Sequence, residues 1–265
     1  MKPLDQSIVK TLTYFDLINF PLMHEELFCY LWTPPRIGHA EFMSTCGETN
    51  YELKAMNYKL GCGYYFLPGR ENLIAERQRA AEITDQKLII ARRAVKFIRS
   101  VPFLKAIFVC NSVGAAMARA ESDIDFFIVS DKNRIWIVRF FTNLILRLFG
   151  LRTYGAHQAD RICLSFYVDI DHLNLAPWRI ADDDIHFAYW LNMMTPVYDP
   201  ENYYEKFLQA NRWVERYLPN LSFRASLPPK ADTARRLPAS GGRNLSVRRW
   251  LIETEIPHPC DGASE

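Results

Sequence analysis

The stretch Ser122-Asp123-Ile124-Asp125-Phe126-Phe127-Ile128-Val129 contains two carboxylates and then four apolar residues. A short apolar run with aromatic and β-branched side chains predicts a buried β-strand. Strand side chains alternate between two faces, so Asp123 and Asp125 point to the same side, about 7 Å apart. Buried carboxylates without partners are costly and repel each other, and a divalent cation relieves both penalties. We therefore predict that Asp123 and Asp125 are metal ligands at the start of a strand.

A second strand and an anion-binding turn are expected directly upstream. Residues 104–110 form a compact apolar run, Asn111-Ser112 follows it, and small residues over 113–120 predict a short helix. A turn into a helix N-terminus presents backbone N–H groups to a phosphate, and the Ser112 hydroxyl adds a donor. A helix N-cap is an equally good interpretation of Ser112. An anion site beside metal ligands is the minimum requirement for phosphoryl or nucleotidyl transfer.

This arrangement resembles the DNA polymerase β-like nucleotidyltransferase superfamily. Its motif is Gly-Ser, a spacer of roughly ten residues, and Asp-x-Asp at the start of a strand. Asn111-Ser112 and Asp123-Ile124-Asp125 occupy those positions, and Ser122 also fits. The resemblance implies an α+β fold, with a mixed β-sheet nucleotidyltransferase domain and packed helices. It also implies a nucleoside triphosphate substrate and a Mg²⁺ cofactor held by Asp123 and Asp125.

The first departure from the family's motif is Asn111, which replaces glycine. Glycine lets the backbone approach a phosphate closely, and asparagine tolerates left-handed conformations better than most residues but adds bulk. Gly114 lies nearby and can supply the missing freedom. The residues predicted to bind the nucleotide are therefore Asn111, Ser112, Gly114 and Ser122.

The second departure concerns the third carboxylate, which the family places on a later strand. The expected strand 162–169 carries Ser165 near the centre of one face and Asp169 at its end. We predict Asp169 as the catalytic base, with Asp160 and Asp171 as the other candidates. If Ser165 occupies the family's position, the base is missing, and the two aspartates bind a metal with little catalysis.

The N-terminal part predicts a small winged-helix-like domain. Helical periodicity covers residues 7–19 and 23–32, and a third helix is expected around 50–60. Glycines then bracket an aromatic strand within 61–70. This segment also resembles the winged helix that precedes nucleotidyltransferase domains in some bacterial proteins. A generic helical cap is the alternative interpretation.

Three regions follow from these patterns: a winged-helix-like domain over 1–73, a nucleotidyltransferase-like domain over 74–220, and a basic, disordered tail over 221–265. A long helix over 73–100 joins the first two. This helix is basic through Arg77, Arg79, Lys87, Arg92, Arg93, Lys96 and Arg99. The last four are predicted to form a solvated face, and a face for nucleic acid is the alternative. Further helices are expected over 182–195 and 201–217.

Composition limits the protein class. The formal net charge is only +2, so bulk charge does not make the chain a polyanion binder. Its six cysteines show no metal or disulfide spacing, and its first residues lack an apolar leader, which predicts a cytoplasmic protein. No transmembrane segment is predicted. Residues 134–150 predict an amphipathic helix with a wide buried face, an interpretation favoured over membrane contact.

The predicted function is Mg²⁺-dependent transfer of a nucleoside monophosphate from a triphosphate to a hydroxyl on a protein, a small molecule or an RNA end. Asp123 and Asp125 would hold the metal, Ser112 would contact phosphates, and Asp169 would act on the acceptor. The alternative is a catalytically degenerate protein of this fold that binds DNA or another protein through its winged helix.

Overall fold

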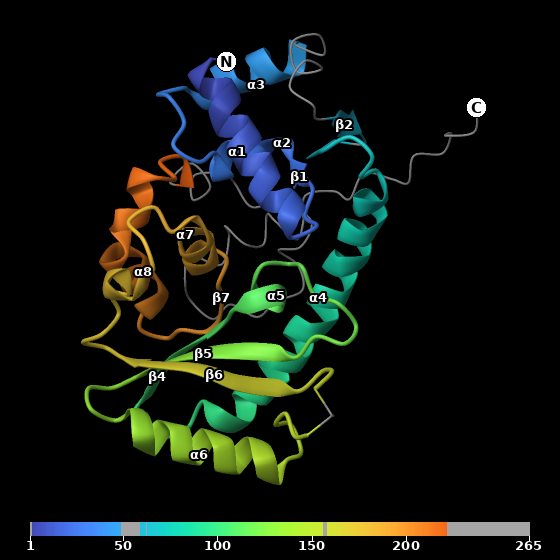
Figure 1. Cartoon of the computed structure of the whole chain (residues 1–265). Helices are drawn as coiled ribbons and strands as arrows, with labels where there is room; N and C mark the ends of the chain where they lie inside the picture. The colour runs from blue at the N-terminus through green and yellow to red at the C-terminus, as the bar shows by residue number, and fades with distance from the viewer. Residues whose placement is uncertain (1, 49–58, 62, 156–157, 222–265) are drawn as a thin grey trace. The chain divides into compact units, whose positions relative to one another are not determined.

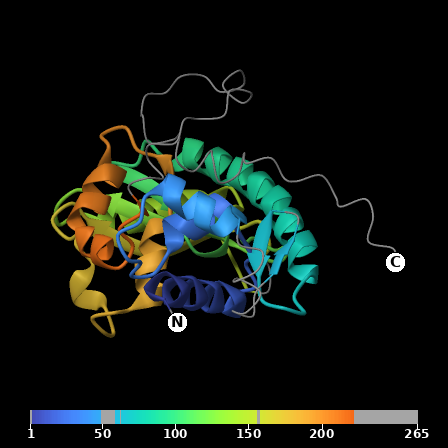
Figure 2. The same cartoon turned by 90° about the horizontal axis from the view of Figure 1, so that it is seen from above.

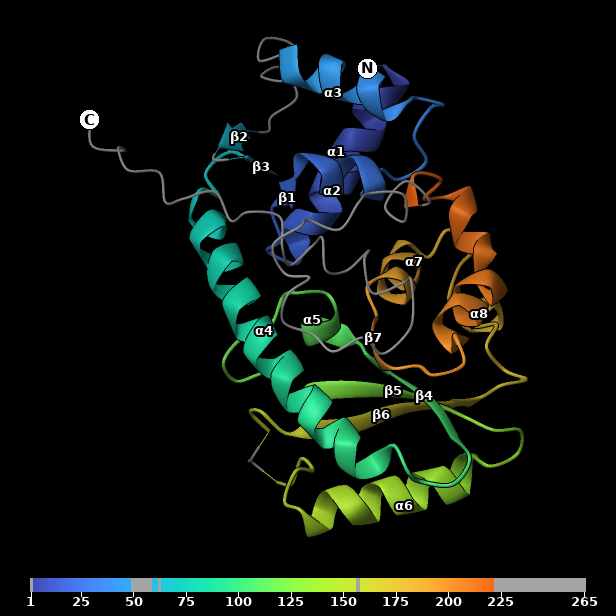
Figure 3. The same ribbon diagram turned by 180° about the vertical axis from the view of Figure 1, so that it is seen from behind.

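The computed structural model describes residues 2–48, 59–61, 63–155 and 158–221. These residues form two compact units, shown in Figure 1. The N-terminal unit contains the described residues up to Arg79 together with 214–221, and the sheet unit is Ala80–Trp213. The division falls inside the long helix α4 (Asn72–Ile98), which runs without a break in Figures 2 and 3. The expected tail, 222–265, lies outside the described residues.

The N-terminal unit alternates helices with short strands. Its elements are α1 (Pro3–Leu17), β1 (Leu22–Met23), α2 (His24–Tyr30), α3 (His39–Glu48), β2 (Lys59–Gly61) and β3 (Tyr64–Phe66). The three strands form an antiparallel sheet in the order β1-β3-β2. The helices expected over 7–19 and 23–32 are confirmed, whereas α3 was not predicted. The end of the expected third helix is wrong because residues 59–60 belong to β2, and residues 50–58 lie outside the described part.

The core of the N-terminal unit contains a buried ion pair that the sequence did not reveal. Arg77 donates to Glu26 over 2.8 Å, and both side chains are almost fully buried. The Arg77 guanidinium also lies over the Phe20 ring, 3.7 Å from its centroid. Arg77 therefore belongs to the core of this unit, although it is one of the residues that make the helix basic.

The sheet unit is a mixed four-stranded sheet with packed helices, so the coarse α-plus-β fold prediction is confirmed. Its elements are β4 (Leu104–Val109), α5 (Asn111–Gly114), β5 (Ile124–Ser130), α6 (Ile135–Leu148), β6 (Ile162–Asp169), the 3-10 helix Ala176–Trp178, α7 (Ile185–Asn192), β7 (Thr195–Tyr198), α8 (Tyr203–Ala210) and the 3-10 turn that begins at Arg212. The strand order is β6-β5-β4-β7. Strand β5 is parallel to β6, and β4 is antiparallel to β5 and β7.

Helices cover both faces of this sheet (Figures 1 and 3). On the face of α7 and α8, Phe127 packs with an aromatic group formed by Phe108, Phe166, Trp190 and Phe207. On the other face, α6 buries only a narrow strip formed by Val138, Thr142 and Leu146. The Thr142 hydroxyl lies 2.8 Å from the Tyr167 hydroxyl of β6.

Several expected elements differ in extent. The helix predicted over 113–120 is the four-residue α5, which begins at Asn111. Strand β7 was not predicted, because Pro196 lies within it, and proline is tolerated on edge strands such as this one. None of the helices in the described residues combines the length and apolar character that crossing a membrane requires.

Candidate metal centre

The candidate metal centre lies at the start of two neighbouring parallel strands. Asp123 immediately precedes β5, Asp125 lies within it, and the pairing of the strands places Asp125 opposite Cys163 of β6. One ligand atom each from Asp123, Asp125 and Cys163 lies within 4.8 Å of the other two. The structure thus brings together the two aspartates that the sequence singled out and adds a thiol.

An irregularity in β6 brings a fourth side chain to this cluster. Asp125 pairs with Cys163, but Phe127 pairs with Phe166, so β6 has one extra residue in this interval. Such a bulge redirects a side chain. The Ser165 hydroxyl consequently donates to Asp125 Oδ1 over 2.5 Å and lies 3.1 Å from Cys163 Sγ. A serine and a cysteine thus occupy the place on β6 where the family resemblance implied a third carboxylate.

Electrostatics in the cluster favour uptake of a positive charge. Burial raises the pKa of Asp123 above its ordinary value, and the charge of Asp125 raises it further. Burial also raises the pKa of the Cys163 thiol; the hydrogen bond with Ser165 opposes this rise, and the two aspartates add to it. A bound divalent cation would lower both pKa values, because it stabilises the deprotonated ligands.

The donor set fits a divalent cation. Mg²⁺ takes oxygen ligands, which the two carboxylates supply. The Cys163 sulfur is a softer donor and suits Zn²⁺ better than Mg²⁺. The structure supports a metal-binding cluster of Asp123, Asp125 and Cys163, and the identity of the metal belongs to the proposal below.

Lys87 of α4 holds the turn that leads into Asp123. Its ammonium donates to the backbone oxygens of Ala120 (3.1 Å) and Ser122 (2.8 Å) and to Asp160 Oδ1 (2.6 Å). The Lys87 side chain is only 1% exposed, so this basic residue of α4 lies inside the protein. Its three bonds join α4, the turn before β5 and the turn before β6, and they thereby position the start of both strands.

The turn at Asn111 has the backbone conformation that normally favours glycine. Asn111 has a φ of +54°, in the left-handed region. Its Oδ1 accepts a 2.8 Å bond from Trp190 Nε1, which directs the amide toward α7. The backbone N–H of Cys110 donates to the Asp125 carbonyl over 3.0 Å, so this turn and the half-buried Ser112 begin beside the aspartate strand. Nucleotide binding by Asn111 and Ser112 stays a prediction.

Gly114 and Ser122 have structural partners in place of the predicted phosphate contacts. A Cβ on Gly114 would lie 2.6 Å from the Val109 carbonyl oxygen, so only glycine fits here, and its N–H donates to the Cys110 carbonyl. The Ser122 hydroxyl accepts a 3.0 Å bond from the Arg119 N–H and closes the turn before Asp123. Both residues stabilise turns next to the site. These contacts do not support nucleotide binding by either residue.

Asp169, the predicted catalytic base, lies away from the aspartate pair. It is at the C-terminal end of β6, paired with Ser130, which is about 16 Å along β5 from Asp125. Burial alone would raise the pKa of Asp169, but hydrogen bonds from His172 and the Asn133 N–H lower it overall. The Asp169 carboxylate thus stabilises the loops that contain Asn133 and His172. The structure does not bring it to the candidate metal centre.

The two reserve candidates for the third carboxylate are also engaged elsewhere. Asp160 accepts from Lys87, and Asp171 forms a 2.6 Å ion pair with Lys132 near the far end of the sheet. The sequence did hold a signal for Lys87, because it lies at helical i, i+4 spacing between Ile83 and Ala91 on the apolar side of α4. Cys163 carried no such signal, since its role depends on the register of two strands.

Comparison with protein-family models and with curated proteins finds no match to this chain.

Proposed function

We propose that the sheet unit is a Mg²⁺-dependent nucleotidyltransferase. The observation that carries this proposal is the convergence of Asp123 and Asp125 next to the left-handed turn at Asn111. Carboxylates that share a site and face an anion-binding turn are the arrangement that nucleotidyl transfer needs. The DNA polymerase β-like resemblance of Asn111-Ser112 and Asp123-Ile124-Asp125 points to the same chemistry.

In the proposed reaction, the acceptor hydroxyl oxygen forms a bond to the α-phosphorus of a nucleoside triphosphate. The bond between the α-phosphorus and its bridging oxygen breaks, pyrophosphate leaves, and the proton of the acceptor hydroxyl passes to solvent water. When bound, Mg²⁺ would supply charge neutralisation on the phosphate oxygens. Asp123 and Asp125 would hold the metal, and Ser112 would offer a hydroxyl to the phosphates. Ser165 keeps Asp125 oriented through its 2.5 Å hydrogen bond.

A second candidate function is favoured by the composition of β6. Within the described residues, the β6 side chains that contact the aspartate pair are Cys163 and Ser165, neither of which is a carboxylate. A site that lacks a base binds a metal–nucleotide without transferring it efficiently. In this case the sheet unit is a nucleotide-binding scaffold.

The N-terminal unit would then be the effector, contacting DNA or a protein as a winged helix. Support for a winged helix comes from its element order, α1-β1-α2-α3-β2-β3, and from the sheet order β1-β3-β2. On this element order, α3 takes the place of the helix predicted around 50–60.

One experiment tests the proposed function and separates the two candidates. The full chain is incubated with each labelled nucleoside triphosphate and Mg²⁺ alongside an Asp123→Asn, Asp125→Asn variant. Asp183→Asn, a change at an exposed aspartate, is the matched control. Metal-dependent thermal stabilisation by a triphosphate together with label transfer, both lost only in the double variant, supports the transferase. Stabilisation without transfer supports the scaffold, and absence of both effects refutes a nucleotide site.

Because the Cys163 sulfur is a soft donor, a substitution at this position tests which metal binds. Because Mg²⁺ depends on oxygen ligands, Cys163→Ser should leave its affinity within about twofold, while Zn²⁺ affinity falls by on the order of tenfold or more. Isothermal titration with each metal measures both constants. Equal losses for the two metals would show that the thiol coordinates Mg²⁺ as well, or that the substitution disturbs both aspartates.

A further inference from the structure

Helix α6 exposes a line of large apolar side chains that the sequence predicted to be buried. Trp136, Phe140, Leu144 and Leu148 follow one another at every fourth position and are 78%, 63%, 41% and 74% exposed. Successive members are about 40° apart around the helix axis, so they form a stripe about 18 Å long that winds about one third of the way around α6. The predicted wide buried face of residues 134–150 is therefore wrong.

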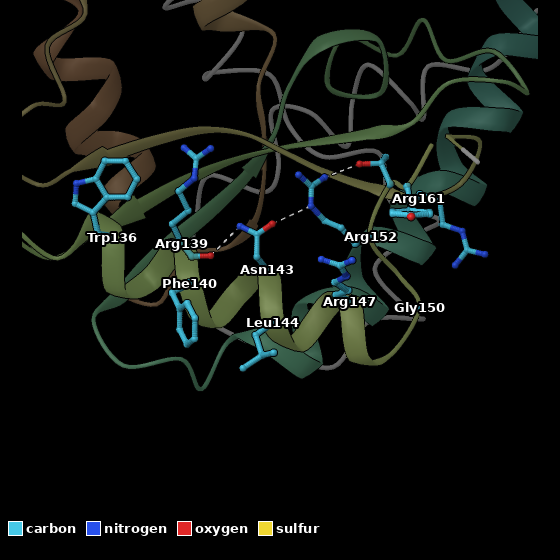
Figure 4. A pocket seen from close by; sticks show the side chains of 11 residues that line it. Trp136, Arg139, Phe140, Asn143, Leu144, Arg147, Gly150, Arg152 and Arg161 are labelled. Atoms are coloured by element: carbon cyan, nitrogen blue, oxygen red, sulfur yellow. Dashed lines mark hydrogen bonds between the residues drawn. The ribbon is translucent and has the colours of Figure 1, made fainter. Parts of the chain in front are cut away.

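A hollow lined by arginines runs beside this apolar stripe. It has a volume of about 1000 Å³ and lies between α6 and the segment that leads to β6. Its cationic lining residues are Arg139, Arg147, Arg152 and Arg161, and no aspartate or glutamate of the described residues is among its lining. Trp136, Phe140 and Leu144 of the stripe also line this hollow. In Figure 4, Trp136, Arg139 and Asn143 extend from the upper side of α6, and Phe140 and Leu144 extend from its lower side.

The arginines are partly preorganised for an anion. Arg152 Nε donates to Asn143 Oδ1 over 3.0 Å, and its guanidinium also donates to the Ile162 carbonyl over 3.1 Å. Arg139 lies over Trp136, with 5.8 Å from its guanidinium carbon to a ring centroid, and Arg147 lies at the same distance from Tyr154. Two arginines of α6 therefore each lie next to an aromatic ring.

Charge and shape together identify the occupant. Nucleic acid uses arginines and aromatic rings, but the stripe continues through two leucines, which offer no ring for base stacking. An interfacial membrane helix needs this combination: a continuous apolar stripe with tryptophan and phenylalanine, flanked by arginines that reach lipid phosphates. We propose that α6 docks on an anionic lipid bilayer, with the apolar stripe at the headgroup–acyl boundary and the arginine hollow against headgroup phosphates. This inference does not depend on the proposed nucleotidyltransferase.

The test uses the full chain and sedimentation with vesicles. Wild-type protein should sediment with vesicles of phosphatidylcholine and phosphatidylglycerol and bind vesicles of phosphatidylcholine alone more weakly. Trp136→Ser and Phe140→Ser should each weaken partitioning by on the order of tenfold, because each removes a large apolar side chain from the boundary. Trp178→Ser is the matched control, since Trp178 is 77% exposed in the same unit and belongs to another element, the 3-10 helix Ala176–Trp178.

A second pair of variants tests the charge. Arg139→Gln with Arg147→Gln should weaken binding to the anionic vesicles by roughly tenfold and leave binding to neutral vesicles unchanged. Arg92→Gln with Arg93→Gln, at exposed positions of α4, should have little effect. All these positions are exposed, so melting temperatures near that of the wild type should show that the fold is retained.

Three results would overturn the proposal. The first is recovery of the wild type in the supernatant with anionic vesicles. The second is self-association that Trp136→Ser abolishes, without vesicle binding, which would make α6 an interface between copies. The third is binding of a single-stranded oligonucleotide that depends on Arg139 and Arg147 while vesicles are ignored.

Discussion

Replacing Lys87 by methionine tests how the start of the metal-binding strand is held. The substitution keeps the length and apolar stem of the side chain and removes the ammonium that bonds two backbone oxygens and Asp160. We expect a loss of unfolding free energy without loss of the overall fold, because methionine is close to lysine in length and volume.

The magnitude follows from the three bonds. A hydrogen bond from a charged donor contributes about 1.5–3 kcal/mol. The Asp160 carboxylate is 57% exposed, so its ion pair with Lys87 adds less than about 1 kcal/mol. Loss of the ammonium also relieves its desolvation, and water reaches the carbonyl of the exposed Ala120, both of which reduce the cost. The expected net loss is about 2–3 kcal/mol.

Urea unfolding followed by circular dichroism measures this loss. With a slope of about 2 kcal/mol per molar urea, the midpoint should fall by about 1–1.5 M. Lys96→Met, at an exposed position of the same helix, should change stability by less than about 0.5 kcal/mol. Asp160→Asn should cost less than about 1 kcal/mol. A Lys87→Met protein as stable as the Lys96→Met protein would refute the assigned role of the ammonium.

Three further predictions follow from packing and charge. Gly114→Ala should destabilise by on the order of 2–4 kcal/mol in calorimetry, because the new Cβ would lie 2.6 Å from a backbone oxygen; Gly38→Ala, where a Cβ meets nothing within 4 Å, should not. Arg77→Leu should cost about 3–5 kcal/mol because it leaves the Glu26 carboxylate buried and unpaired, and adding Glu26→Gln should restore part of that in urea unfolding. The raised pKa of Asp123 means that the folded metal-free protein loses stability as pH rises from the ordinary aspartate pKa to the raised one. Asp123→Asn should therefore raise the unfolding free energy at neutral pH, measured with a chelator present, and should not raise it below about pH 3.9. An equal gain in unfolding free energy at both pH values would contradict this prediction.

Much of the sheet unit could be predicted from local pattern. The runs at 104–110, 124–130 and 162–168 form β4, β5 and β6, because short apolar runs rich in β-branched and aromatic residues favour buried strands. The two aspartates at the start of β5 also converge, since residues two apart on a strand share a face.

Other features depended on contacts between distant residues. Whether Cys163 or Asp169 joins the aspartates is decided by the register of β6 against β5, and a bulge of one residue brings Ser165 in as well. In α6, apolar residues occupy both buried and exposed positions, so the apolar pattern of the sequence could not show that Trp136 faces outward.

By itself, then, the sequence determined strands β4, β5 and β6, the carboxylate pair and the polar turn at Asn111, because each depends on the preferences of neighbouring residues and on the alternation of side chains. Tertiary structure alone decided which partners complete the site, since pairing register and burial are properties of segments far apart in the chain. The same lysine is a solvated charge on an isolated helix, and in the fold it is a buried connection among α4 and the starts of β5 and β6.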